Sequence, residues 1–558
     1  MLDSLVKLSP YSETDHMLGL SFLDKEHTIA RPGFNRWLVP PAALAIHLSI
    51  GMAYGFSVFW LPLSKAIGIS GPVACHADMS FFAKVFTTTC DWPISMLGWM
   101  FTLFFVFLGS SAAIFGSWVE RSGPRKAGVA AAFCWAGGLV ISTIGVLTHQ
   151  IWLLWLGSGV IGGIGLGLGY ISPVSTLIKW FPDRRGMATG MAIMGFGGGA
   201  MIGAPLADRL MKFFATPTDV GVWATFLTLA VIYFVFMMGG AFGYRVPPAD
   251  WKPAGWNPPA ANGNKMITTR NVHVDQAVKT PQFWFIWGVL CLNVSAGIGL
   301  IGMASPLLQE VFGGKLIGIV ATFNELHVAQ KAQIAAIAAG FTGLLSLFNI
   351  GGRFAWASLS DYIGRKATYM VFFILGFALY ASIPTIAHAG NLVLFVAFLC
   401  IILSMYGGGF ATIPAYLADM FGTKMVSAIH GRLLTAWSTA GVLGPVLVNY
   451  IREYQLARGV PSAQAYDVTM YILAGLLAVG LICNLLVKPV AEKHFMKDDA
   501  VKPVSKPAAA SKETLPAESK PVHGSSGFIG VTVAWAAVGI PLAFGLWTAV
   551  QQAVVLFR

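Results

Sequence analysis

An arginine stands deep within an otherwise apolar stretch of this sequence. Residues 346–366 read SLFNIGGRFAWASLSDYIGRK, and Arg353 comes eight residues before Asp361, the first clear loop charge. At ~1.5 Å per helical residue, its guanidinium would lie about 12 Å inside the end of a membrane-spanning helix, too deep for an interface anchor. No acidic residue lies in the interior of the same helix. Such an arginine predicts an anionic ligand that binds and leaves.

Two structural explanations for Arg353 stay open beside a ligand: a backbone carbonyl as partner, or a cation–π contact with an aromatic ring. Asn349 precedes it by one helical turn, so both side chains would share a face. His47 is another polar residue inside an apolar run. We interpret His47 as a buried packing histidine, with a proton carrier as the alternative.

The elements that must position these residues are membrane-spanning helices. The 558 residues are 56% hydrophobic and 11% charged, as is typical of polytopic membrane proteins. We therefore predict an all-α membrane protein with twelve helices plus a thirteenth at the carboxyl end. The apolar runs that predict them are approximately 37–61, 94–119, 127–148, 151–178, 187–211, 222–243, 282–307, 335–359, 367–387, 392–418, 428–450, 467–487 and 528–555.

The charge pattern predicts the orientation of these helices. The net charge is +12, yet no basic face with interleaved aromatics indicates nucleic-acid binding. Most Lys and Arg fall in segments on the side of the amino terminus, which the positive-inside rule places in the cytoplasm of a bacterial-type plasma membrane. Residues 1–36 lack a signal peptide's apolar region and cleavage site. Cys75 and Cys90 share the first outer loop, as a disulfide or as two free thiols.

The sequence repeats itself. GSWVERSGPR at 116–125 matches ASLSDYIGRK at 357–366, which places Glu120 on Asp361 and Gly123 on Gly364 at an offset of 241. The chain is therefore predicted to contain two homologous six-helix halves in parallel arrangement. The expected segments are a cytoplasmic amino terminus (1–36), the first half (37–243), a linker (244–280), the second half (281–487), a disordered Lys/Pro/Ala tail (488–527) and an additional helix (528–558).

The loop pattern Gly-x-x-x-acid-Arg-x-Gly-x-Arg and its weaker copy resemble the conserved loop of the major facilitator superfamily, over about residues 37–490. Several phrases are similar to the oxalate/formate antiporter family: GMAYGFSVF, GLGLGYISPVSTLIKWFPDRRGMATG, NIGGRFAWASLSDYIGRK, YGGGFATIPAYLADMFG and HGRLLTAWSTAG. The resemblance implies that Arg353 binds the substrate carboxylate. It also implies an aromatic binding cavity formed by Tyr54, Tyr170, Tyr406 and Phe410.

Two positions depart from the related families. Oxalate exchangers carry a lysine in helix 11 where this chain has Trp437, and monocarboxylate/proton symporters carry an aspartate where it has Asn349. A dianion opposite Arg353 alone would leave one buried charge uncompensated, on the order of several kcal/mol unfavourable. We therefore expect a preference for monocarboxylates such as formate, lactate or pyruvate. Two alternatives remain: a protonated His47 replaces the lysine, or Trp437 is an ordinary lipid-facing or packing residue.

Glu120 and Asp361 end the helices before the two related loops. An acid there can pair with the positive end of a helix or a basic residue of the other half and hold an inner gate shut. We expect Glu120 to pair with the start of helix 11 near Arg432, and Asp361 with the start of helix 5 near Arg185. The remaining gate candidates, for which positive-inside anchoring is the alternative, are Arg121, Arg125 and Arg365.

Together these features predict a secondary transporter of small carboxylates that works by alternating access, most simply as an anion exchanger. The alternatives are a proton-coupled monocarboxylate symporter and a transporter-like carboxylate sensor. No metal-ligand spacing, nucleotide-binding loop or nucleophile constellation is present in the sequence. We therefore expect no enzymatic activity, no metal and no cofactor, and a monomer whose partners are its substrate and the lipid bilayer.

Overall fold

The computed structural model describes residues 20–69, 72–76, 78–249, 251–256, 266–497 and 525–554. Over these residues the protein is nearly all helical, with isolated β-bridges and no strand. Thirteen of the described helices are long and apolar enough to cross a membrane. This confirms the predicted fold class. Most of the tail expected to be disordered, residues 498–524, lies outside the described residues, as do residues 1–19.

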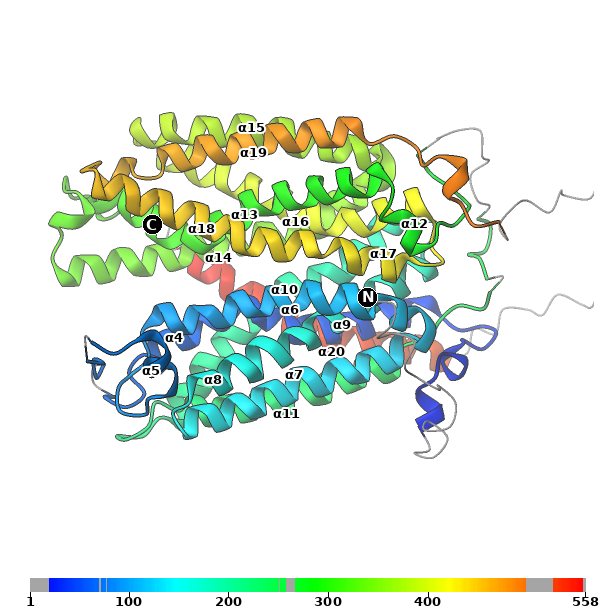
Figure 1. The fold of residues 1–558 in the computed structure, drawn as a ribbon, viewed down its shortest axis with the longest axis horizontal. Helices are drawn as coiled ribbons and strands as arrows, with labels where there is room; N and C mark the ends of the chain where they lie inside the picture. Colours follow the sequence, from blue (N-terminus) through cyan, green and yellow to red (C-terminus); the bar gives the residue numbers. More distant parts are fainter. Residues whose placement is uncertain are drawn as a thin grey trace, which may run out of the picture.

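Six spans form the amino-terminal half, which lies below the other half in Figure 1. The first span, Arg36–Leu63, changes its winding at Gly51, where the α-helix gives way to a 3-10 segment. The helices of this half are α3 (Val39–Ile50), α4 (Trp60–Leu63), α6 (Ile94–Ser122), α7 (Pro124–Leu147), α8 (Ile151–Leu154), α9 (Gly163–Trp180), α10 (Arg185–Phe214) and α11 (Val222–Gly243). A π-helical segment, Trp155–Gly162, joins α8 to α9, and α5 (Phe81–Phe86) lies in the loop before α6.

The carboxy-terminal half repeats this plan. Its α13 and α14 extend beyond the apolar runs because a helix can continue past the hydrocarbon layer into the loop region. The short α12 (Val274–Ala277) lies in the linker. The helices of this half are α13 (Pro281–Phe312), α14 (Val328–Ile363), α15 (Arg365–His388), α16 (Leu392–Phe421), α17 (Val426–Leu433), α18 (Thr435–Ala457) and α19 (Asp467–Leu486), and α17 and α18 together form one span.

The two related loops are tight reversals built on glycine. Helix α6 gives way to α7 at Gly123, with φ of 88°, and α14 gives way to α15 at Gly364, with φ of 87°. Positive φ is accessible to glycine without the steric cost that a Cβ brings. Each reversal leaves the acid of the last helical turn, Glu120 or Asp361, in contact with the opposite half.

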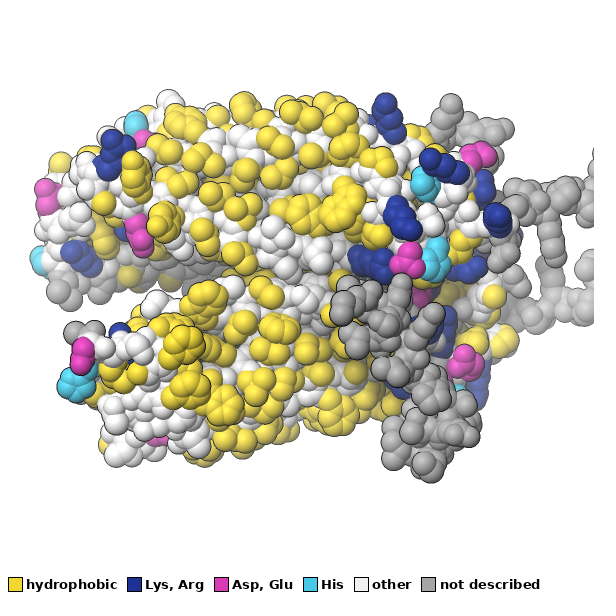
Figure 2. Space-filling view, viewed as in Figure 1, with side chains coloured by type: hydrophobic (Ala, Val, Ile, Leu, Met, Phe, Trp, Pro, Cys, Tyr) yellow, Lys and Arg dark blue, Asp and Glu magenta, His cyan; other side chains and the backbone are white. Residues whose placement is uncertain are grey.

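The halves meet along two seams, α10 against α14 and α16, and α6 against α17 and α18. Glycines permit the close approach: a Cβ on Gly190 would lie 2.9 Å from the Arg353 carbonyl, and one on Gly116 would lie 2.8 Å from the Ala428 Cα. We call the side that carries α12 the linker face and the side that carries α5 the disulfide face. The halves are joined near the linker face and separate toward the disulfide face (Figures 1 and 2).

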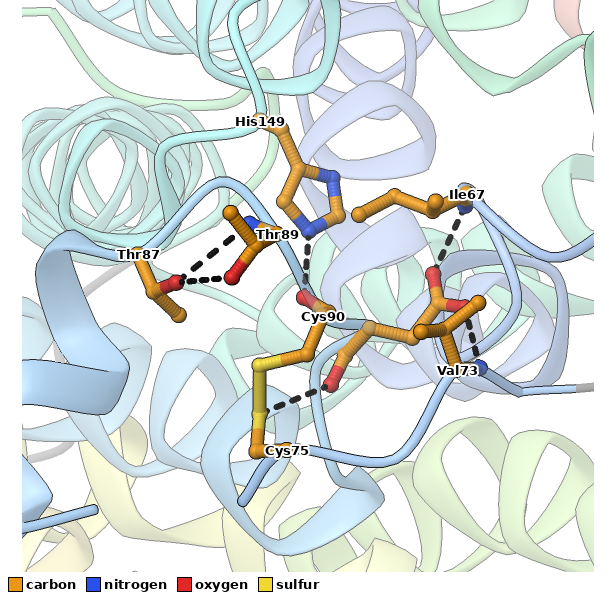
Figure 3. Close-up of a disulfide and its surroundings, with 8 residues drawn as sticks. Ile67, Val73, Cys75, Thr87, Thr89, Cys90 and His149 are labelled. Carbon is orange, nitrogen blue, oxygen red and sulfur yellow. Dashed lines mark hydrogen bonds between the residues drawn. A yellow bond between two sulfur atoms is a disulfide. The ribbon is translucent and has the colours of Figure 1, made fainter.

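The loop before α6 is held by a disulfide between Cys75 and Cys90, whose Cα atoms are 5.0 Å apart (Figure 3). Of the two arrangements that the sequence left open, the structure has the disulfide. His149, from the loop between α7 and α8, donates from Nε2 to the Cys90 carbonyl at 2.9 Å and stacks on Trp92 with ring centroids 4.0 Å apart. Burial of this ring lowers the pKa of His149, partly offset by the Cys90 hydrogen bond.

The thirteenth span, α20 (Ser525–Val554), packs against α3, α10 and α14 and so contacts both halves (red in Figure 1). Near the linker face, the Trp535 indole donates a hydrogen bond to the Trp37 carbonyl at 3.0 Å. Near the carboxyl end of α10, which lies toward the disulfide face, the Arg209 guanidinium lies 5.5 Å from the Phe544 ring of α20. Helix α20 therefore crosses from the linker face to the disulfide face.

Candidate functional site

Arg353 is fully buried on α14, where the two halves meet. Its Nε donates to the Asn349 side chain at 3.1 Å, and its Nη1 donates to the Ile193 carbonyl of α10 at 3.2 Å. The guanidinium also lies 5.8 Å from the Phe196 ring and 5.4 Å from the Phe410 ring. Both structural partners that the sequence left open are thus present. They leave Nη2 buried without a hydrogen-bond partner among the described residues.

An aromatic cluster surrounds Trp437, which is fully buried on α18. This burial shows that the lipid-facing interpretation of Trp437 was wrong. Phe196 and Phe410, the two rings beside Arg353, are both in contact with the indole. The ring centroids of the cluster lie 4.4 Å (Phe410), 5.2 Å (Tyr170), 5.4 Å (Phe105), 5.4 Å (Phe196) and 6.4 Å (Tyr54) from that of Trp437.

Three polar groups of this cluster are buried without a hydrogen-bond partner in the described part of the chain: Arg353 Nη2, Tyr170 OH and Trp437 Nε1. Most buried polar groups in proteins are hydrogen-bonded, so unsatisfied groups require an explanation. Here they come from α14, α9 and α18 and share Phe196 as a neighbour. Each of the three groups could donate a hydrogen bond to a small anion bound nearby.

Two tyrosines join the halves beside this cluster. The hydroxyls of Tyr54 and Tyr406 lie 3.3 Å apart, and Tyr406 packs edge-on against Phe410. Tyr54 is partly exposed, whereas Tyr406 is buried. The structure therefore brings the four aromatic residues named from sequence, Tyr54, Tyr170, Tyr406 and Phe410, to the surroundings of Arg353.

Two histidines lie beside the cluster. His47 is fully buried and stacks on Tyr170, with Nδ1 2.5 Å from the Ala192 carbonyl and Nε2 3.3 Å from the Tyr170 carbonyl. A neutral imidazole donates from one nitrogen, whereas an imidazolium donates from both. His430, which sequence reasoning missed, lies on α17 with its ring 5.9 Å from Tyr170 and its Nε2 buried without a described partner.

Glu120 bridges the halves at the linker face. Its Oε1 accepts from the Ser427 N–H at 2.8 Å, at the start of α17, and its Oε2 accepts from Lys179 at 2.6 Å. The carboxylate thus lies at the start of helix 11, as expected, and binds the Ser427 backbone there rather than the Arg432 side chain. Arg432 is in the last turn of α17 and pairs with Asp275 of α12 at 2.9 Å. The positive amino end of α17 therefore supplies the contact.

Asp361 makes the equivalent contact in the other half. It accepts from the backbone N–H groups of Gly186 and Met187 at 2.8 and 2.9 Å, in the first turn of α10. This is the expected start of helix 5 near Arg185, and the Arg185 side chain itself pairs with Asp419 at 2.8 Å. Arg365 bridges the two acids, at 2.6 Å from Asp361 and 3.0 Å from Asp419. Sequence reasoning missed Asp419, although an acid in the last turn of the apolar α16 was a detectable signal.

The other two gate candidates make no cross-half contact that the structure describes. Arg121 is exposed at the end of α6. Arg125 donates to the carbonyl of Phe22, in the amino-terminal segment, at 2.9 Å and lies 5.8 Å from the ring of Phe242, in the amino-terminal half. These placements favour the anchoring interpretation for both residues.

Known proteins resemble this chain in both fold and sequence. Residues 43–445 match the family model of the Major Facilitator Superfamily, and the chain belongs to this superfamily of multi-pass membrane transporters. The chain is 26% identical over 413 residues to the oxalate:formate antiporter of Oxalobacter formigenes, covering 74% of this chain and 83% of that one. This confirms the resemblance that the motifs indicated.

Other relatives and solved structures agree with this assignment. The chain is 25% identical over 342 residues to the apicoplast pyruvate carrier 1 of Toxoplasma gondii, covering 52% of this chain and 58% of that one. Among solved structures, the fucose:proton symporter of E. coli aligns with a TM-score of 0.55 at 12% identity, covering 82% of this chain and all of that one. The human organic anion transporter TETRAN aligns with a TM-score of 0.53 at 15% identity, covering 82% of this chain and all of that one. These structural likenesses concern the fold alone.

Proposed function

We propose that this protein is a secondary transporter of small monocarboxylates that works by alternating access, with anion exchange as its mode. The unpaired Nη2 of the buried Arg353 is the observation that carries this proposal. A carboxylate would accept from Nη2 with one oxygen and from Tyr170 OH or Trp437 Nε1 with the other. Its charge would offset that of the guanidinium, which has no acidic partner among the described residues.

The charge count supports a monoanion. Among the described residues around the cluster, Arg353 is the permanent cation, and Trp437 occupies the position where a second cation would be needed. A dianion would leave one negative charge buried, at a cost on the order of several kcal/mol. The names of two relatives specify small carboxylates, namely the dianion oxalate and the monoanion formate in one case and the monoanion pyruvate in the other.

Exchange is favoured over proton symport because Asn349 lies beside Arg353, hydrogen-bonded to it, where the related proton symporters carry an aspartate. The symport alternative rests on His47, whose two ring nitrogens both lie at hydrogen-bonding distance from carbonyls. A protonated His47 would satisfy both acceptors and would carry a proton with the substrate. A pH gradient that drives uptake in the absence of internal substrate would favour symport.

The contacts of Glu120 and Asp361 support a transport cycle in which the linker face closes and opens. Both acids bind the amino ends of helices in the opposite half, and such contacts form only when the halves meet at this face. We propose that the linker face is cytoplasmic, in a bacterial-type inner membrane, and that the protein works as a monomer. The positive-inside pattern and the disulfide on the opposite face support this orientation.

Counterflow in proteoliposomes tests the proposed function. Vesicles loaded with unlabelled formate, lactate or pyruvate should transiently accumulate the same anion in labelled form. Vesicles loaded with oxalate should accumulate less of that labelled monocarboxylate. A carboxylate sensor would bind the anion but give no counterflow, so binding without exchange would contradict the proposal.

A further inference from the structure

An apolar groove of about 490 Å³ opens between α3, α11 and α20. Most of its lining is small and apolar, including Ala45 on α3, Val235 on α11 and Ala537 on α20. A Cβ placed on Gly239, in the α11 wall, would meet nothing within 4 Å, so the space in front of this glycine is open. The groove is separate from the site around Arg353.

The groove has the length of one lipid chain within a leaflet. It extends along α11 from Val235 to Arg245, just beyond the helix end. The eight helical steps from Val235 to Gly243 at ~1.5 Å each give about 12 Å, and the extended Tyr244 and Arg245 add to this, so the groove spans roughly half of a hydrocarbon core about 30 Å thick. A groove that runs from the edge of the hydrocarbon core to its middle is shaped for an acyl chain lying parallel to the helices.

The linker-face end of the groove is positively charged. Arg245 is the one charged residue among those that line it, and its Nη1 donates to the Phe242 and Tyr244 carbonyls at 2.9 and 2.7 Å. Within the described part of the chain, no carboxylate pairs with Arg245. A second cation, Arg125, lies over the Phe242 ring and donates to a carbonyl. Among the described residues, two guanidinium groups without an acidic partner therefore lie beside Phe242, at the linker-face end of α11.

We propose that this groove binds an anionic phospholipid, with one acyl chain between α3, α11 and α20 and the phosphate at Arg245. The chain fills the apolar space, and the headgroup supplies the negative charge that the described residues do not. The bound lipid then links α20 to the amino-terminal half of the transporter, because the walls come from α3 and α11. This site is independent of the proposed substrate.

Native mass spectrometry of the delipidated full-length protein, titrated with phosphatidylglycerol or with phosphatidylcholine of the same chain length, tests the proposal. Wild type should retain one phosphatidylglycerol more tightly than further adducts. Gly239→Leu should weaken this first binding at least fivefold, because its side chain fills the groove. Arg245→Gln should weaken phosphatidylglycerol binding to the level of phosphatidylcholine.

Two control variants match these changes elsewhere. Gly137→Leu places the same side chain on α7, where a Cβ also meets nothing within 4 Å, and Arg184→Gln removes an exposed cation outside the groove. Both should bind lipid like wild type. The proposal is overturned if Gly239→Leu and Arg245→Gln retain phosphatidylglycerol as the controls do, or if wild type binds both lipids equally. It is also overturned if the protein is a dimer in which a second copy of the chain occupies the groove, so that Gly239→Leu alone dissociates the dimer.

Discussion

Removing the negative charge of Asp361 should open the linker face. The carboxylate accepts hydrogen bonds from the Gly186 and Met187 N–H groups of the opposite half, at 2.8 and 2.9 Å. Its ion pair with Arg365 lies within one half and can persist when the halves separate. To a first approximation, this ion pair therefore does not affect the equilibrium between the closed and open states of the linker face. Asp361→Asn leaves one carbonyl acceptor for two donors and removes the charge from the positive end of α10.

The structure sets the size of this effect. A net contribution of ~1.5–3 kcal/mol for a hydrogen bond to a charged group, with a further ~0.5 kcal/mol for the helix end, gives a loss of about 2–3.5 kcal/mol. At about 1.4 kcal/mol per factor of ten, the equilibrium should shift roughly 30- to 300-fold toward the state open at the linker face.

Electron–electron double resonance measures this shift with spin labels at positions 184 and 424, which are exposed on the linker face in opposite halves. Wild type should show one short distance, and Asp361→Asn should add a longer one that dominates. The control is Asp208→Asn, because Asp208 pairs with Lys212 within a single helix. An unchanged distance distribution in both Asp361→Asn and Glu120→Ala would refute the gate assignment.

Three further changes have defined outcomes. Gly190→Ala places a Cβ 2.9 Å from the Arg353 carbonyl, so it should shift the same label distances toward the open state without removing a charge. Trp437→Lys adds the second cation, so oxalate should gain in competition assays against labelled monocarboxylate at least tenfold over wild type; no gain would contradict the charge count. Burial lowers the pKa of His149, so the folded loop on the disulfide face favours the neutral imidazole. The stabilisation of this loop by His149 is therefore complete above the pKa of ~6.5 that histidine has in the unfolded chain, and it is lost progressively as the pH falls below that value. Hydrogen exchange in residues 78–92, corrected for the intrinsic rate, should rise between pH 7.5 and 5.5 in wild type more than in His149→Gln.

The architecture was predictable because hydropathy and the internal repeat report directly on membrane spans. Each predicted apolar run has a helix, and the repeat places Glu120 and Asp361 in equivalent contacts with opposite halves. The depth of Arg353 within its run was likewise sufficient to single it out, because few forces compensate a buried guanidinium.

The detailed partners were less predictable because backbone groups leave no mark in a sequence. At the expected helix starts near Arg185 and Arg432, the N–H groups of Gly186 and Ser427 make the contacts, and those two arginines pair with other acids. Phe105 and Phe196 were also missed, since a ring that lines a site and a ring that packs in a core look alike in sequence. The position of α20 against both halves depends on long-range packing that its own composition does not specify.

Counterflow by Arg353 variants tests the central claim most directly. Arg353→Lys keeps the charge but loses the planar set of five donors, so exchange of labelled monocarboxylate in proteoliposomes should fall tenfold or more while the protein still inserts and folds. Arg209→Lys, at a guanidinium that faces the Phe544 ring outside the site, is the control and should transport like wild type. Full counterflow by an Arg353→Gln protein would contradict the assignment of Arg353 as the residue that binds the substrate carboxylate.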